Sequence, residues 1–304
     1  MKVVQFRQYG GIDVLEVVDV PKYRATGHEV VVQVKATGIN PGESKLREGM
    51  MRGFAALEFP SGEGSDFAGI VSEVGPDVRH FKMGDAVVGH TDKRASHAEY
   101  VGVSEDDLVL KPESVSWEVA GALFVAGTTA YASVQAVGLK PGDKVIVSGA
   151  SGGVGSIAVQ LANLQHAEVY GIAGEENHDW LRSKGIVPIS YSGDVRANIQ
   201  AVVPHPDAFI DTVGKGYVKL AIDLGVKPER INTIADFAAA QQYGVKTAGS
   251  AQAATTDVLK DLLNKVADGS LEVPIAKTFP LEDVRGAYSF LGSQHHRGKV
   301  VLLP

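Results

Sequence analysis

Hydrophobic positions alternate with polar ones along the first third of the chain, in short runs separated by turns that contain glycine. The runs at 3–6, 16–20, 30–36, 67–75 and 86–89 are rich in β-branched residues. Alternation over four to eight residues is typical of strands with one buried face. Many short strands between glycine turns indicate a compact, barrel-like β-rich unit.

The pattern changes near Ser116, which is a suitable N-cap for a helical stretch that begins at Trp117. Beyond it, short apolar runs alternate with longer segments of helical character. We predict strands at 144–148, 167–172, 208–211 and 230–234, and helices at 154–164, 178–184 and 256–268. Strands and helices that alternate at this spacing indicate βαβ units and a parallel sheet, so the fold class is α/β.

The end of the chain returns to a β-rich pattern, with predicted strands at 275–279 and 299–303. The order is therefore β-rich, α/β and β-rich again. The simplest organisation is a discontinuous β-rich domain of residues 1–118 and 266–304. A doubly wound, Rossmann-type domain of residues 119–265 is inserted into it.

Composition excludes several classes of function. The 304 residues are 44% hydrophobic and carry a net charge of −7, which argues against nucleic-acid binding. No apolar run approaches the roughly 20 residues that span a bilayer. The chain has no cysteine, which excludes disulfides, cysteine nucleophiles and thiolate metal ligands. Residues 1–5 begin a strand rather than a signal peptide, so we expect a cytoplasmic protein that binds neither membranes nor nucleic acid.

The most informative motif is the glycine-rich turn between the predicted strand 144–148 and the predicted helix 154–164. It is Gly149-Ala150-Ser151-Gly152-Gly153-Val154-Gly155. In such a turn one glycine permits the tight bend, the next lets the backbone approach a pyrophosphate, and the last lets the helix pack on the strand. The N–H groups at the start of the helix then bind the anion. We predict a dinucleotide site, and not a Walker A loop, because no Gly-Lys-Ser/Thr follows.

The second strand of this unit is followed by Gly174, Glu175 and Glu176. An acidic residue about 20 positions beyond the glycine turn binds the adenosine ribose and favours NAD. Alternatively, both glutamates cap the first turn of the next helix and face solvent. The sequence supports the two interpretations equally.

A series of short blocks, in this order and spacing, resembles the medium-chain dehydrogenase/reductase superfamily in its quinone oxidoreductase (zeta-crystallin-like) branch. The resemblance extends nearly end to end. The blocks are residues 36–41, 64–69, 83–87, 97–101, 127–131, 149–155, 211–214 and 297–301.

The resemblance implies a GroES-like catalytic domain and a Rossmann domain with the cofactor between them. It implies hydride transfer from NADPH or NADH to a quinone or an α,β-unsaturated carbonyl compound, and commonly a homodimer. The family slightly favours NADPH, whereas Glu175 and Glu176 disfavour it. Zinc-dependent relatives use cysteine ligands and the histidine of a Gly-His-Glu motif. This chain has Gly64-Ser65-Asp66 there and no cysteine, so we expect no zinc.

The resemblance also assigns residues. Asn40 would lie near nicotinamide and substrate and donate to a substrate carbonyl; alternatively it forms a turn before Pro41. Thr129 would stand at the start of a helix in the cleft, or be an ordinary helix-start hydroxyl. Tyr191 would pack on the adenosine ribose or phosphate, or merely at a strand end. The residues expected around the cofactor are Gly149, Ser151, Gly152, Gly153, Val154, Gly174, Glu175, Tyr191, Thr212, Val213, Thr233, Ala235 and Lys299, the last in a segment 294–299 at the phosphate end.

Other roles stay open in the sequence. Glu43 is either a proton relay or, more simply, a structural carboxylate. No tyrosine general acid carries over from the relatives, because Lys45 stands at that position. The apolar segments 50–59 and 243–250 predict a small hydrophobic carbonyl or quinone substrate. The alternatives are an alkenal or enoyl double-bond reductase with little quinone activity, or a non-catalytic NAD(P)H-binding redox sensor.

Overall fold

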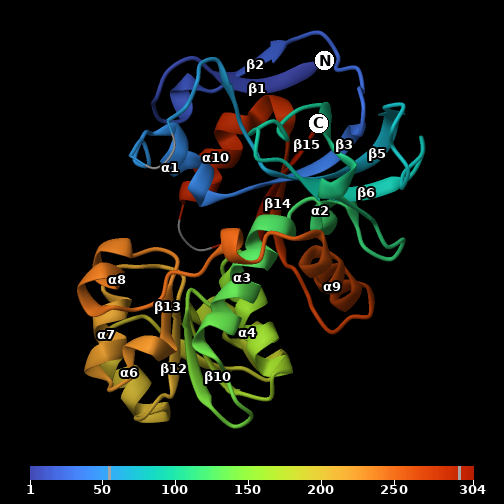
Figure 1. Ribbon diagram of the computed structural model, residues 1–304. Helices are drawn as coiled ribbons and strands as arrows, with labels where there is room; N and C mark the ends of the chain where they lie inside the picture. Colours follow the sequence, from blue (N-terminus) through green and yellow to red (C-terminus); the bar gives the residue numbers. More distant parts are fainter. Residues whose placement is uncertain (54–55, 294–295) are drawn as a thin grey trace.

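Two large β-sheets occupy opposite halves of the molecule, and helix α3 (Phe124–Val137) lies between them (Figure 1). The computed structural model describes residues 1–53, 56–293 and 296–304. Both chain termini lie in the half formed by the N-terminal strands. The predicted α/β fold, with a β-rich unit and a parallel-sheet unit, is confirmed.

The β-rich half contains a seven-stranded sheet with the order β14-β15-β3-β5-β6-β8, to which β7 adds by pairing with β3. Valines on alternate positions of β3 pack with Phe67 and Val101 in a buried cluster, as the alternating pattern predicts. A smaller sheet of β2, β1 and β4 lies beside it. The strands are β1 (Lys2–Phe6), β2 (Glu16–Asp19), β3 (Glu29–Ile39), β4 (Ser61–Gly62), β5 (Asp66–Val74), β6 (Ala86–His90), β7 (Tyr100–Ser104), β8 (Leu108–Leu110), β14 (Ile275–Pro280) and β15 (Lys299–Leu303).

The other half contains a five-stranded, fully parallel sheet with the order β11-β10-β9-β12-β13. The chain leaves central strand β9 in one direction through β10 and in the other through β12. This reversal creates a crevice at the carboxyl ends of the strands, which is where ligands bind in such sheets. The strands are β9 (Lys144–Ser148), β10 (Glu168–Ala173), β11 (Val187–Ser190), β12 (Ala208–Asp211) and β13 (Ile231–Thr233).

The remaining helices cover these sheets or join them. Besides α3 they are α1 (Pro41–Arg47), α2 (Trp117–Ala120), α4 (Gly155–Leu164), α5 (His178–Ser183), α6 (Val195–Val202), α7 (Tyr217–Asp223), α8 (Phe237–Tyr243), α9 (Thr256–Ala267) and α10 (Val284–Gly292). The pattern of the sequence predicted α4, α5 and α9, but not α1, α6, α7, α8 or α10. The helical stretch expected after Ser116 is divided into α2 and α3.

The main buried cluster continues from one half into the other. It combines Ala68 and Val88 of the seven-stranded sheet with Val134 of α3, Val147 of the parallel sheet and Leu262 of α9. The two halves are therefore held together by apolar contacts as well as by the chain crossings. The exact boundaries at 118/119 and 265/266 remain predictions.

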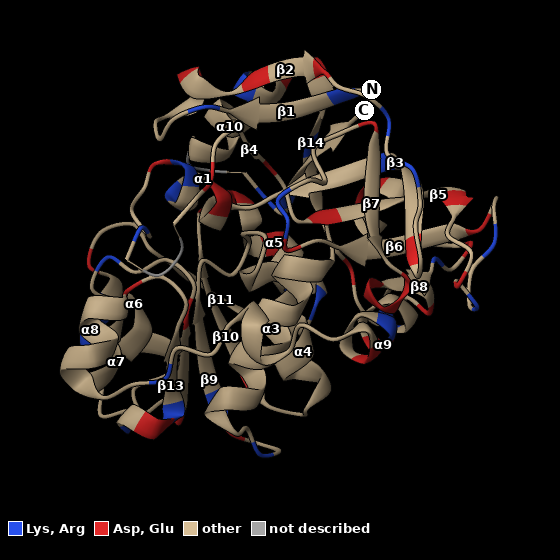
Figure 2. Ribbon diagram, turned by 45° about the horizontal axis from the view of Figure 1, so that its top comes forward, with Lys and Arg blue, Asp and Glu red and all other residues tan. Residues whose placement is uncertain are grey.

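Charged residues are dispersed along the elements of both halves (Figure 2). Within the described residues, no helix is both long and apolar enough to cross a membrane. The longest, α3, has 14 residues, while a transmembrane helix needs about 20.

Candidate cofactor-binding and active site

The predicted glycine turn connects β9 to α4 at the carboxyl edge of the parallel sheet. Gly149 has φ +63°, and a Cβ on it would lie 2.7 Å from Thr212 Oγ1. A Cβ on Gly155 would lie 2.0 Å from the Gly149 carbonyl oxygen. Side chains at these two positions would break the turn. The bond from Gly152 N–H to the Gly149 carbonyl, 2.9 Å long, closes it.

The same turn is more open at Gly152. A Cβ there would meet a single described atom within 4 Å, the Gly149 oxygen at 3.3 Å. Helix α4 has ten residues and begins directly behind the turn. The N–H groups of Ser156 and Ala158 donate to the Gly152 and Val154 carbonyls, whereas no hydrogen bond among the described residues engages the N–H groups of Val154 and Gly155. These N–H groups and the dipole of α4 favour an anion. The arrangement fits the pyrophosphate of a dinucleotide.

Asp211 organises the neighbouring strand ends. Its Oδ1 accepts from the Ser148 hydroxyl at 2.7 Å and from Val213 N–H at 3.0 Å. Its Oδ2 accepts from the Thr233 hydroxyl at 2.7 Å. One buried carboxylate therefore ties the ends of β9, β12 and β13 together. Sequence analysis placed the segment 211–214 at this edge but did not foresee the central role of Asp211.

The two threonines expected near the cofactor are built into this edge. Thr212 Oγ1 donates to the Ser148 carbonyl at 2.7 Å. Thr233 Oγ1 accepts from the N–H of Ala235 at 3.2 Å. Val213, in contrast, is 37% exposed. The threonine hydroxyls thus shape the edge, and Val213 offers an apolar surface to a ligand.

The residues expected at the adenosine end gather where β10 and β11 end. Gly174 precedes a short 3-10 helix, Glu175–Asn177, and both glutamates are exposed. The Ser190 hydroxyl donates to Glu175 Oε1 at 3.4 Å. The next residue, Tyr191, is 40% exposed. Its pKa is raised, first by partial burial and then by the Glu176 carboxylate. This placement is compatible with both interpretations of the glutamates.

On the β-rich side, Asn40 directly follows β3 and is the N-cap of α1. Its backbone N–H donates to Glu43 Oε2 at 2.9 Å, while Glu43 N–H donates to the Asn40 carbonyl at 3.1 Å. This reciprocal pair is a capping arrangement, and the spacing Asn-x-x-Glu could have predicted it. It favours the structural interpretation of Glu43.

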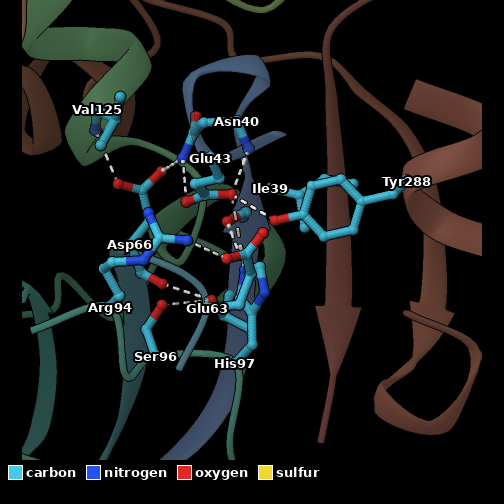
Figure 3. Close-up of polar contacts among 12 residues, drawn as sticks. Ile39, Asn40, Glu43, Glu63, Asp66, Arg94, Ser96, His97, Val125 and Tyr288 are labelled. Atoms are coloured by element: carbon cyan, nitrogen blue, oxygen red, sulfur yellow. Dashed lines mark hydrogen bonds and ion pairs between the residues drawn. The ribbon is translucent and has the colours of Figure 1, made fainter. Parts of the chain in front are cut away.

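The side-chain amide of Asn40 is fully engaged (Figure 3). Its Nδ2 donates to Glu43 Oε1 at 3.2 Å and to Asp66 Oδ2 at 3.1 Å, and its Oδ1 accepts from the Lys299 ammonium. An amide nitrogen has two N–H groups, and both are directed at carboxylates here. Donation from Asn40 to a substrate carbonyl therefore remains a prediction that needs a rearranged amide.

Asp66 joins the two halves of the molecule. Its Oδ1 accepts from Val125 N–H at 2.9 Å, in the first turn of α3, while Oδ2 lies at Asn40. Burial raises the pKa of the Asp66 carboxyl to about 6, although the Lys299 ammonium opposes the rise. The sequence contains Asp66 within a matching block, but the block did not reveal this contact.

Lys299 approaches the site from β15. Its ammonium is buried, donates to the Ile39 carbonyl at 3.1 Å and lies 3.9 Å from Asp66 Oδ2. Burial lowers its pKa. The preceding Gly298 donates its N–H to Ser151 O at 2.9 Å, so this part of the segment 294–299 borders the glycine turn. Gln294 and His295 lie outside the described residues.

A second layer of buried polar groups supports α1. Tyr288 donates its hydroxyl to Glu43 Oε2 at 2.8 Å, and burial raises its pKa well above the ordinary value. Glu63 is held by Arg47 and Arg94, while burial raises its pKa to about 7. These partners are far apart in the sequence, and the sequence analysis missed them.

Thr129 corrects one expectation. It lies in the second turn of α3, not at the start of the helix. Its hydroxyl donates to the Val125 carbonyl at 2.6 Å. This internal bond is common for threonine within helices. Thr129 is connected to the Asn40 cluster through Val125, whose N–H donates to Asp66 Oδ1.

Large apolar side chains are exposed near the predicted substrate segments. Met50 is 71% exposed after α1, and Phe237 is 55% exposed at the start of α8. Phe54 and Ala55, within the predicted segment 50–59, lie outside the described residues. The segment 243–250 is partly buried, and its Lys246 and Ala248 pair with β13 through backbone and Asn232 contacts.

Known proteins with this fold resemble the chain along its whole length. The alcohol dehydrogenase GroES-like domain matches residues 26–113, and the zinc-binding dehydrogenase family matches residues 188–302. The NADPH-dependent alkenal/one oxidoreductase of Arabidopsis thaliana is 30% identical over 100% of this chain and 80% of its own length. The solved quinone oxidoreductase of Coxiella burnetii is 31% identical, with a TM-score of 0.88 over 100% of this chain and 99% of its own.

A third relative matches over a shorter part. The chloroplast envelope quinone oxidoreductase homolog of Arabidopsis thaliana is 39% identical over 194 residues, which are 61% of this chain and 59% of that protein. Together these similarities confirm the resemblance found in the sequence. The chain belongs to the medium-chain dehydrogenase/reductase superfamily, in its quinone oxidoreductase branch.

The zinc in one family description does not fit this chain. The chain has no cysteine, and the described residues contain no group of three histidine, aspartate or glutamate side chains that could hold a metal. Ser65 stands where zinc-dependent relatives carry a histidine ligand. A serine hydroxyl is a poor zinc ligand compared with imidazole or thiolate.

Proposed function

We propose that the protein is an NAD(P)H-dependent reductase that transfers hydride to a small hydrophobic quinone or α,β-unsaturated carbonyl compound, without zinc. The observation that carries this proposal is the glycine turn at the strand reversal of the parallel sheet, opposite Asn40. The names of the relatives support the reaction class. The exposed Val213, Met50 and Phe237 support an apolar substrate.

In this proposal the nicotinamide supplies the hydride, and the protein contributes binding and orientation. The backbone of the glycine turn holds the pyrophosphate. Asn40, Asp66 and Lys299 provide a buried, hydrogen-bonded wall beside the reacting groups, where electrostatic interactions are strong because water is excluded. The proton that completes the reduction comes from water, directly or through a relay; Glu43 accepts from the Tyr288 hydroxyl and would belong to such a relay.

We further propose that NADH is preferred over NADPH. Glu175 and Glu176 are exposed at the end of β10, where they would repel a 2′-phosphate. The nearby cations are engaged elsewhere. Arg182 pairs with Asp179 at 2.8 Å, and Lys184 pairs with Glu272 at 2.5 Å.

Fluorescence titration with both cofactors tests this preference. We expect tighter binding of NADH, and about tenfold tighter binding of NADPH after the double change Glu175→Gln and Glu176→Gln, which is about 1.4 kcal/mol. Glu168→Gln, at the opposite end of β10, is the matched control and should change neither affinity. Tighter binding of NADPH by the unaltered protein would contradict the proposed preference.

The reaction is tested by oxidation of NADH and NADPH at 340 nm with 1,2- and 1,4-quinones and with alkenals. Turnover of quinones supports the proposal in full. Turnover of alkenals alone identifies a double-bond reductase, the closest alternative. Tight cofactor binding without turnover of any acceptor would instead indicate a redox sensor.

Three further properties remain proposals. Turnover should survive chelator treatment, and metal analysis of the purified protein should find no stoichiometric zinc. A homodimer is expected from the family and is tested by light scattering. A cytoplasmic location is expected from the sequence and is tested by cell fractionation.

A further inference from the structure

We propose that Lys299 is a positioning residue of the reaction site, which couples the cofactor turn to Asn40 and fixes the orientation of the Asn40 side-chain amide. This inference rests on the proposed function. Sequence analysis gave Lys299 a different place, at the cofactor phosphate. The stem of Lys299 contacts the glycine turn, and its ammonium contacts Asn40.

The backbone and stem of Lys299 are anchored on the glycine turn. Gly298 forms a bridge with Gly152 and donates its N–H to the Ser151 carbonyl at 2.9 Å. A Cβ on Gly153 would lie only 3.0 Å from Lys299 Cδ, so the stem packs directly on the turn. A shift of the turn is thereby transmitted to the lysine side chain.

The ammonium of Lys299 lies at the end of β3, in the other half of the molecule. It donates to the Ile39 carbonyl at 3.1 Å and to Asn40 Oδ1, with Asp66 Oδ2 at 3.9 Å. Burying an ammonium costs several kcal/mol, and a buried ion pair often stabilises a fold no more than apolar residues would. A role in stability alone therefore explains this lysine poorly.

The charges around Asn40 permit a single orientation of its amide. The oxygen faces the Lys299 ammonium, and the nitrogen faces the carboxylates of Glu43 and Asp66. A flip would place N–H groups against the cation and the oxygen against two carboxylates. All three contacts would become repulsive, because amide nitrogen only donates and amide oxygen only accepts.

The consequence concerns the reacting groups. Asn40 follows β3 beside the region where the family places nicotinamide and substrate, while the stem of Lys299 lies on the turn that would hold the pyrophosphate. Lys299 thus links the position of the Asn40 side chain to the position of the cofactor turn. With its amide held in this orientation, Asn40 acts through the position of the wall it forms and not by donating to a substrate carbonyl. Small misplacements at a reacting centre reduce turnover strongly while leaving substrate and cofactor binding nearly intact.

A simpler alternative is that Lys299 only neutralises Asp66. Lys299→Met then harms the protein by leaving a buried carboxylate without a cation. The double change Lys299→Met and Asp66→Asn removes both charges and separates the alternatives. Asn at 66 keeps a side-chain oxygen that can accept from Val125 N–H.

The experiment is a mutant cycle of Lys299→Met and Asn40→Ala, with kcat, KM and cofactor affinity measured for each variant. We expect each single change to lower kcat about tenfold or more, with KM and cofactor Kd within about threefold. The combined variant should be no slower than the slower single variant, because Lys299 acts through Asn40. The neutral pair Lys299→Met with Asp66→Asn should regain stability but not kcat.

Two results would overturn the proposal. One is full recovery of kcat in the neutral pair, which would leave Lys299 a counterion only. The other is a combined variant whose kcat falls by the product of the two single reductions, which would show that Lys299 and Asn40 act independently. If Lys299→Met does not fold, the cycle is run in a background that carries Asp66→Asn. The four proteins are then Asp66→Asn, the neutral pair, and each of these two with Asn40→Ala added.

A readout without turnover separates this proposal from the proposed function. In protein with ¹⁵N-labelled asparagine, the side-chain N–H₂ of Asn40 should exchange slowly with solvent, and faster in Lys299→Met, which keeps both carboxylate acceptors. Equal exchange rates would overturn the positioning role even if no acceptor were reduced. An unaltered protein that reduces no acceptor, but shows the expected exchange, would contradict the proposed function alone.

Discussion

The two sides of the site are built differently. On the cofactor side, the glycine turn follows β9 and Asp211 ends β12. Each lies within one short motif or block that can be recognised in the sequence. On the substrate side, Asn40 follows β3, while Asp66 and Lys299 belong to β5 and β15; these residues are up to 259 positions apart. Local backbone rules determine the first, whereas long-range packing of buried charges determines the second. The changes below act on one side at a time, from the largest expected effect to the smallest.

Gly152→Val should have the largest effect, on cofactor binding. A branched side chain would occupy the open side of the turn, so the backbone could no longer approach the pyrophosphate. We expect cofactor Kd to rise at least about a hundredfold, which is about 2.7 kcal/mol, in a protein with an unchanged circular dichroism spectrum. Gly11→Ala, at an exposed position with open space around it, is the control. A folded Gly152→Val protein with normal affinity would exclude the turn as the phosphate site.

Asp211→Ala should have the next largest effect, on stability. The change removes the acceptor shared by Ser148, Val213 and Thr233 at the carboxyl edge. Buried donors left without a partner cost about 1–3 kcal/mol each, and relaxation recovers part of that cost. We expect the free energy of unfolding in urea to fall by about 2–4 kcal/mol. Asp211→Asn should lose less, and equal losses in the two variants would contradict the role of the shared oxygens.

Asp66→Asn acts on the substrate side and should change how stability depends on pH. The folded pKa of Asp66, about 6, lies above its ordinary value of 3.8. Between these values the folded protein binds more protons at Asp66 than the unfolded chain, so ionisation lowers stability as pH rises from about 4 to 6. Asp66→Asn should not show this loss of stability, which amounts to about 1–3 kcal/mol between pH 4 and 6.

The measurement is urea unfolding at several pH values, with Asp92→Asn, at an exposed carboxylate, as the control. The control should leave the slope unchanged. An identical slope in Asp66→Asn and the unaltered protein would show that the buried carboxylate has no elevated pKa. Glu63, whose pKa is raised to about 7 by burial, should retain its own contribution in both variants.

The difference between the cofactor side and the substrate side also explains what could be predicted from the sequence. Four of the five strands of the parallel sheet and the glycine turn follow from periodicity and local spacing and were predicted closely, whereas β11 was missed. The capping pair of Asn40 and Glu43 was visible in the sequence but overlooked. The contact of Lys299 with Asn40, and of Asp66 with Val125, depends on how distant strands pair, which no local pattern contains. Thr129 was misplaced because a matched block does not define where a helix begins.

The central claim is direct hydride transfer from a nicotinamide bound at the glycine turn. The most direct measurement uses NADH carrying deuterium at both C4 positions and an α,β-unsaturated ketone, with the product analysed by mass spectrometry. Our account predicts one deuterium at the β-carbon of the saturated ketone and a solvent proton at the α-carbon. Cofactor oxidation or product formation without deuterium at the β-carbon would contradict it.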